Sequence, residues 1–91
     1  MNKQARVLFH GRVQGVWFRA FTSQQASAAK LTGWVRNLPN GSVEALFAGE
    51  EETIKQVIEK CRQGPPSAQV ENVELHWEPA SDEFLTFEVR H

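Results

Sequence analysis

Two glycines and an arginine mark the point at which an alternating, strand-like pattern gives way to a helix-like one. The segment is Gly11-Arg12-Val13-Gln14-Gly15-Val16-Trp17-Phe18-Arg19. Because glycine adopts backbone angles that other residues avoid, the chain between Gly11 and Gly15 can curl and point successive N–H groups into one concavity that binds anions. A helix that begins near Phe18 would aim its unpaired first-turn N–H groups and its positive dipole end at the same place. The segment is therefore a candidate phosphate-binding loop, although an ordinary turn followed by a surface cation has the same spacing.

A second segment makes the interpretation more specific. Gly33-Trp34-Val35-Arg36-Asn37-Leu38-Pro39-Asn40-Gly41-Ser42-Val43 is followed six residues later by Gly49. Together the two segments resemble the paired signatures of the acylphosphatase family, small enzymes that hydrolyse the carboxyl-phosphate bond. The first matches the pattern G-x-V-Q-G-V-x-F-R, and the second matches G-aromatic-x-basic-N-x-x-x-G-x-V-x-x-x-x-x-G. The chain departs from the family at Phe9, where an aliphatic residue is usual, and at Trp17, which fills a variable position with a large side chain.

Arg19 and Asn37 are the candidate catalytic residues. The planar guanidinium of Arg19 can form two parallel hydrogen bonds to a phosphoryl group, which an ammonium cannot do. The Asn37 amide offers both a donor and an acceptor, and the resemblance implies that it positions the nucleophilic water. Gln14, Gly15, Val16, Trp17 and Phe18 are expected to contribute mainly backbone N–H groups. The alternatives are a surface salt bridge for Arg19 and a backbone-capping turn for Asn37.

No general base is evident in the sequence, and the resemblance implies that a phosphate oxygen of the substrate accepts the proton of the water. His10 is expected to be an exposed or hydrogen-bonded residue at a strand end rather than a base. Asn40, followed by Gly41, is expected to form a turn. Core and rim packing is the expected role of the three tryptophans, Trp17, Trp34 and Trp77. Cys61 lies at an apolar helical position, and we expect it to be buried.

Composition excludes several other classes of function. Ten basic and eleven acidic residues give a formal net charge of −1, so the chain lacks the basic surface that nucleic acid or an anionic membrane would attract. Its N-terminus lacks the apolar run of a signal peptide, and no segment reaches membrane-spanning length. A single cysteine excludes an internal disulfide, and Asp82 is the only aspartate. We therefore expect no metal site and no cofactor.

Hydrophobic periodicity predicts the order of elements. Strands are expected over 4–10, 31–37 and 42–48, in a fourth segment with Val73, Leu75 and Trp77 on one face, and in a short fifth with Leu85, Phe87 and Val89 on one face. Helices are expected over 18–30 and from Glu50 to the break at Gly64-Pro65-Pro66. This order predicts an α+β, ferredoxin-like βαββαβ sandwich over a single domain, 1–91: an antiparallel sheet of four strands plus a short fifth, with both helices on one face. The acylphosphatase resemblance implies the same architecture.

The sequence thus predicts a metal-independent hydrolase that converts small acyl phosphates to a carboxylate and inorganic phosphate. We expect a monomer in the cytoplasm that binds neither nucleic acid nor membranes. A ligand-binding or regulatory domain that keeps the phosphate cradle without turnover is the main alternative. A second alternative, an RNA-binding module on the same sandwich, lacks the aromatic and basic strand pattern. The motifs do not identify the physiological acyl phosphate.

Overall fold

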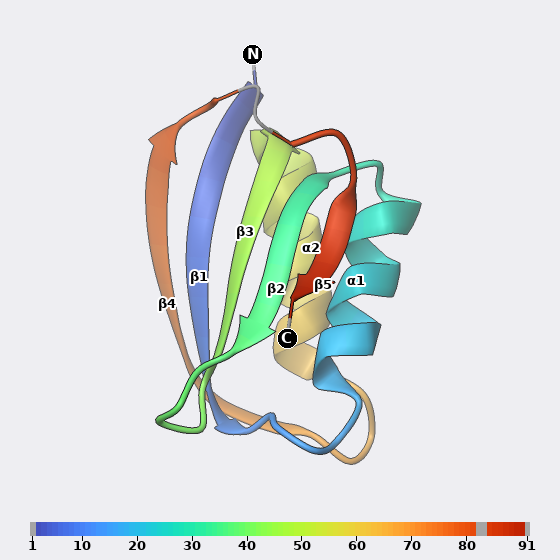
Figure 1. The fold of residues 1–91 in the computed structure, drawn as a ribbon, viewed down its shortest axis with the longest axis vertical. Coiled ribbons are helices and arrows are strands. Elements are labelled where there is room, and N and C mark those ends of the chain that lie inside the picture. Colours follow the sequence, from blue (N-terminus) through green and yellow to red (C-terminus); the bar gives the residue numbers. More distant parts are fainter. Residues whose placement is uncertain (1, 82–83, 91) are drawn as a thin grey trace.

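Five strands and two helices form a two-layer sandwich in the computed structural model, which describes residues 2–81 and 84–90. The elements follow one another along the chain as β1 (Asn2–Arg12), α1 (Phe18–Ala28), β2 (Thr32–Asn37), β3 (Val43–Glu50), α2 (Glu51–Gln63), β4 (Gln69–Pro79) and β5 (Phe87–Arg90). The strands form one sheet in the order β4-β1-β3-β2-β5, and both helices cover the same face of it (Figure 1). The predicted ferredoxin-like fold is confirmed.

The sheet is mixed, because its edge strand β5 runs parallel to its neighbour whereas the other neighbouring strands are antiparallel. β1 pairs antiparallel with β3 and β4, and β2 pairs antiparallel with β3, whereas β5 lies parallel to β2. Pairing with β2 begins at Phe87, opposite Gly33. Leu85 therefore lies before the strand and is 91 % exposed, so the prediction that it belongs to the fifth strand with Phe87 and Val89 is wrong.

The core lies between the sheet and the helices, where alternate strand residues point at the apolar faces of α1 and α2. Its largest fully buried side chains are Phe9, Phe18, Phe47 and Ile54. Phe9 packs edge to face on Phe18, with ring centroids 5.0 Å apart, so the large residue at position 9 supports the first turn of α1. Cys61 is fully buried as predicted, and burial raises the pKa of its thiol to about 11.

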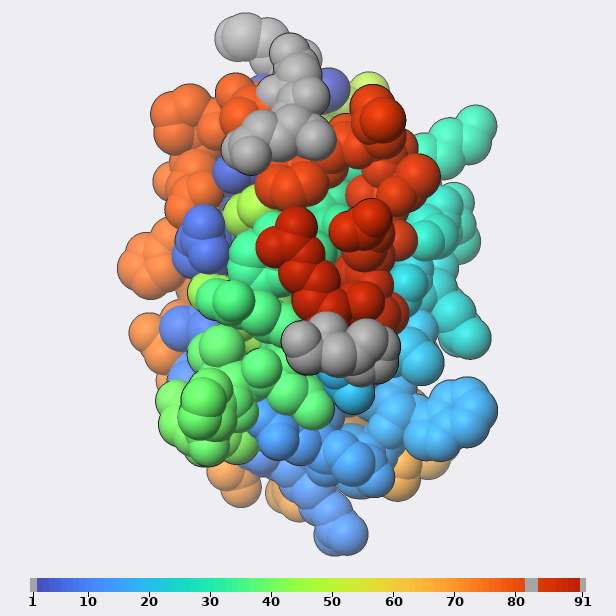
Figure 2. All heavy atoms as spheres, viewed as in Figure 1, coloured from blue at the N-terminus to red at the C-terminus, as the bar shows by residue number. Residues whose placement is uncertain are grey.

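The face of the sheet away from the helices, which is turned to the viewer in Figure 2, carries paired charges. Arg36 binds Glu44 at 2.6 Å, and Arg6 binds both Glu44, at 3.3 Å, and Glu78, at 3.0 Å. Trp34 is buried among these side chains, with three guanidinium groups within 5.8 Å of its ring, so its expected packing role is confirmed. This face is held together by its own ion pairs.

Candidate active site

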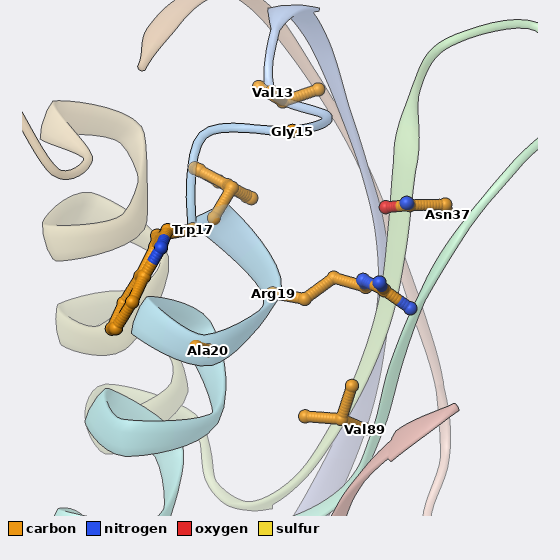
Figure 3. Close-up of a pocket in the computed structure, with 8 residues that line it drawn as sticks. Val13, Gly15, Trp17, Arg19, Ala20, Asn37 and Val89 are labelled. Atoms are coloured by element: carbon orange, nitrogen blue, oxygen red, sulfur yellow. The ribbon is translucent and has the colours of Figure 1, made fainter. Parts of the chain in front are cut away.

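A cavity of about 430 Å³ lies at the end of the sandwich where the loop after β1, the start of α1, the end of β2 and the strand β5 meet (Figure 3). It is lined by Val13, Gly15, Trp17, Phe18, Arg19, Ala20, Asn37 and Val89. The structure therefore brings five of the seven predicted site residues to one cavity. The other two, Gln14 and Val16, belong to the same loop but do not line the cavity.

The loop and the helix start leave several backbone donors without partners. Gly15 and Trp17 both have left-handed backbone angles, with φ values of 73° and 69°. Within the described residues, no side chain caps the N-terminus of α1, and the first turn contains no acidic residue. The first helical hydrogen bond runs from the Phe21 N–H to the Trp17 carbonyl at 2.9 Å, and no N–H of residues 14–18 donates to a described residue. These groups are available to an anion.

Arg19 is the second residue of α1 and reaches from the helix toward the end of β2 (Figure 3). Its Nη1 donates a hydrogen bond to the carbonyl oxygen of Arg90 in β5, at 3.0 Å. The last strand therefore helps to hold the guanidinium in the cavity. A planar cation lies next to the uncommitted N–H groups, as the anion-site prediction requires.

Asn37 is the last residue of β2, and its amide points into the space between Gly15 and Arg19 (Figure 3). Its Oδ1 is buried and accepts no hydrogen bond from the described residues. The alternative role of a turn cap belongs instead to Asn40, whose Oδ1 accepts hydrogen bonds from the Ser42 N–H at 3.0 Å and the Ser42 hydroxyl at 2.6 Å. Leaving a buried acceptor unpaired costs about 1–3 kcal/mol, so the Asn37 amide is placed for a partner other than the protein.

The Gln14 side chain has a role that the sequence interpretation missed. Its Nε2 donates to the Leu38 carbonyl at 2.7 Å and to the Ser42 carbonyl at 2.8 Å. That the loop, Gln14 included, binds phosphate mainly through its backbone N–H groups stays a prediction. Backbone carbonyls carry no residue-specific signal, and these two lie 24 and 28 positions further along the chain, so no sequence pattern indicates this contact.

Three other loop residues divide into buried and exposed side chains. Val16 and Phe18 are buried and pack in the core. Trp17 is 76 % exposed, and its ring points away from Arg19 and Asn37 (Figure 3). The predicted packing role of Trp17 is therefore wrong, because the left-handed backbone at this residue turns its side chain toward solvent.

His10 lies outside the cavity. Its Nε2 is 2.5 Å from Glu74 Oε2 on the neighbouring strand β4, which confirms the predicted hydrogen-bonded histidine at a strand end. Among residues 2–81 and 84–90, no three histidine, cysteine, aspartate or glutamate side chains are placed to hold a metal ion. Asp82 and His91 lie outside the described residues.

Comparison with known proteins identifies the family of this chain. Residues 5–89 match the acylphosphatase family model. The chain belongs to the acylphosphatase family. The acylphosphatase of Rubrobacter xylanophilus is 50 % identical over 89 residues, which cover 98 % of this chain and 81 % of that protein.

Solved structures of the family share the whole fold. The crystal structure of the acylphosphatase from Bacillus subtilis superposes with a TM-score of 0.94 at 33 % identity and full coverage of both chains. An acylphosphatase from Coxiella burnetii superposes with a TM-score of 0.92 at 38 % identity, covering 98 % of this chain and 93 % of that one. The likeness therefore includes both the candidate loop between β1 and α1 and the segment that carries Asn37.

Proposed function

We propose that this protein hydrolyses small acyl phosphates to a carboxylate and inorganic phosphate without a metal ion, using Arg19 and Asn37. Membership of the acylphosphatase family supplies the reaction class: the protein is a hydrolase that acts on acyl phosphates. The observation that carries the assignment of residues is the meeting of Arg19, Asn37 and uncommitted loop N–H groups at one cavity.

The phosphoryl group would bind between the loop and Arg19. Negative charge in phosphoryl transfer spreads over three equatorial oxygens. The N–H groups of residues 14–18 and the positive end of the α1 dipole would meet some of these oxygens, and the Arg19 guanidinium would meet others. Because these donors are in place before the substrate arrives, they stabilise the transition state without reorganising.

Asn37 would hold the attacking water in line with phosphorus. Its amide makes no hydrogen bond to a described residue, so its acceptor and donor groups can both bind the water. The P–O bond to the acyl group breaks as the water oxygen bonds to phosphorus, and the carboxylate leaves. A phosphate oxygen accepts the proton of the water, so no side chain has to act as the general base.

The purified protein should hydrolyse acetyl phosphate at the same rate with and without a chelator. Glycerol phosphate should be a poor substrate, because an alkoxide is a far worse leaving group than a carboxylate and needs protonation. Inorganic phosphate should inhibit competitively. Comparable rates on the two substrates would contradict the proposal, and phosphate binding without acetyl phosphate hydrolysis would favour the regulatory-domain alternative.

We further propose that the protein acts as a monomer in the cytoplasm, as the sequence led us to expect. In the part of the chain that the structure describes, no helix is both long and apolar enough to span a membrane.

A further inference from the structure

The Gln14 side chain connects the two halves of the candidate site: the loop before α1 and the β2–β3 hairpin that begins after Asn37. We propose that Gln14 is a positioning residue that sets the distance between the bound phosphoryl group and the water held by Asn37. This inference rests on the proposed function, because it assigns those two ligands to the two halves. Gln14 itself does not line the cavity, so it would act through the elements that it connects.

The contact consists of two hydrogen bonds that one nitrogen, Gln14 Nε2, donates to the hairpin. A glutamine Nε2 carries two hydrogens, and here they reach two acceptors, the carbonyls of Leu38 and Ser42. The Leu38 N–H also donates to the Ser42 carbonyl at 2.9 Å, and this hydrogen bond joins the two ends of the β2–β3 turn. Leu38 directly follows Asn37, so Gln14 is attached one residue away from the candidate water-binding amide.

The two halves differ in how firmly they are held. The hairpin is closed by its own backbone hydrogen bonds and by the Asn40 side chain. The loop has no N–H from 14 to 18 bound to a described residue, and besides Gln14 it is tied by the Ser67 hydroxyl, which donates to the Val16 carbonyl at 3.3 Å. Val16 and Phe18 also pack in the core, but within the described residues the hydrogen bonds that join the loop to the hairpin come from Gln14. In Figures 1 and 2, the segment after β1 and the hairpin turn lie side by side at the same end of the molecule.

This connection matters because transfer to water needs a fixed approach to phosphorus. A misplacement of about 1 Å in an active site can lower the rate about 10²-fold. Loss of the Gln14 hydrogen bonds would leave the phosphate-binding groups and Asn37 intact but no longer aligned with each other. Turnover would then fall more than phosphate affinity.

Gln14→Met tests this directly, because methionine keeps the length of the side chain and removes both donors. We expect kcat for acetyl phosphate to fall roughly 10- to 100-fold, while the inhibition constant of inorganic phosphate changes less than about threefold. Gln4→Met is the matched control. Gln4 is a buried glutamine that binds Glu78 and Ser81 far from the cavity, and its loss should lower the unfolding temperature but not kcat.

A double-mutant cycle with Asn37→Ala separates positioning from a general structural role. Asn37→Ala alone should lower kcat by about 10²-fold, the scale for one preorganised polar group, with phosphate affinity retained. If Gln14 acts through Asn37, adding Gln14→Met to Asn37→Ala should lower kcat little further. Fully additive losses would overturn the proposal, and so would a loss of phosphate affinity as large as the loss of kcat.

The same experiments distinguish failure of this inference from failure of the proposed function. A wild-type protein that does not hydrolyse acetyl phosphate contradicts both. A wild-type protein that hydrolyses it while Gln14→Met retains full kcat contradicts only the role of Gln14. If Gln14→Met does not fold by circular dichroism, Gln14→Ala, which leaves room for water at the two carbonyls, is judged by the same criteria. If neither variant folds, Gln14 is a stability residue and the proposal is wrong.

Discussion

The two helices lie on the same face of the sheet, but their N-termini differ in the charged side chains that surround them. α2 begins with Glu51 and Glu52 in its first turn, and Glu51 is bound by Lys3 at 2.6 Å and by Lys55 at 3.0 Å. α1 has no acidic residue in its first turn and, within the described chain, no side-chain cap. The positive end of α2 is therefore neutralised by its own side chains, whereas that of α1 is left for a ligand.

The entry into each helix differs as well. Glu50 precedes α2 with an ordinary extended backbone, whereas Trp17 precedes α1 with a left-handed one. A left-handed backbone costs a residue other than glycine roughly 1–2 kcal/mol. Strain of this kind persists where the surrounding structure imposes it, and it gathers at binding sites. The difference agrees with the proposal that the α1 terminus binds the substrate at some cost to stability, while the α2 terminus is stabilised by its own charged side chains.

The largest expected effect comes from Arg19, the arginine at the N-terminus of α1. Arg19→Lys keeps the charge but loses the planar pair of donors, so kcat/KM for acetyl phosphate should fall about 10³-fold, the lower end of the range for arginines that stabilise phosphoryl transfer. Steady-state kinetics and phosphate inhibition would measure this effect. Arg62→Lys, the same change on α2, is the control and should have wild-type kinetics. Near-normal turnover in Arg19→Lys would remove Arg19 from the mechanism.

The sequence predicted the elements that depend on local periodicity. The alternation in β1 and the helical spacing of Ile54, Val57 and Ile58 reflect which side chains are buried, so a local pattern predicts these elements. The parallel pairing of β5 with β2 and the exposure of Leu85 were not predicted. Both depend on where a short strand reaches a distant edge, which no local pattern specifies.

For the candidate site, the sequence predicted some residues and missed the contacts or exposure of others. Arg19 and Asn37 were found because their side chains carry the chemistry and lie in recognisable motifs, and the structure brings them to one cavity. The contact from Gln14 was missed because its acceptors are backbone carbonyls. The exposure of Trp17 was missed because its left-handed backbone cannot be inferred from residue type, since glycine is the usual occupant of such angles.

A smaller effect, on phosphate binding, is expected when an acidic residue is introduced into the first turn of α1, as in α2. Ala20 lies in the first turn of α1 and lines the cavity. Ala20→Glu places a carboxylate beside the phosphate position, so the inhibition constant of inorganic phosphate should rise by about tenfold through charge repulsion. The helix itself should gain a few tenths of a kcal/mol or more from its dipole.

Ala20→Gln separates charge from size in this experiment. The glutamine fills nearly the same space without the charge, so its effect on phosphate inhibition should be much smaller than that of the glutamate. Equal effects of the two substitutions would mean that the side chain blocks the cavity, and the electrostatic contrast between the helices would lose its support.

The smallest expected effect concerns the neutralised terminus of α2. Hydrogen bonds from Lys3 and then Lys55 lower the pKa of Glu51 to about 2, from an ordinary value of 4.5. Because the pKa is depressed in the folded protein, the stabilising contribution is complete above the unfolded value and is lost as the pH falls from about 4.5 toward 2.

Lys3→Met should raise the pKa of Glu51, as followed by NMR of its carboxyl carbon, and should make the unfolding temperature less sensitive to pH in this range. The group is exposed, so the change in stability should be small and should shrink further in high salt. Turnover of acetyl phosphate by Lys3→Met at neutral pH should equal that of the wild type, because this terminus does not face the substrate. A pKa that stays near 2 without Lys3 would show that Lys55 and the helix dipole suffice to hold Glu51 ionised.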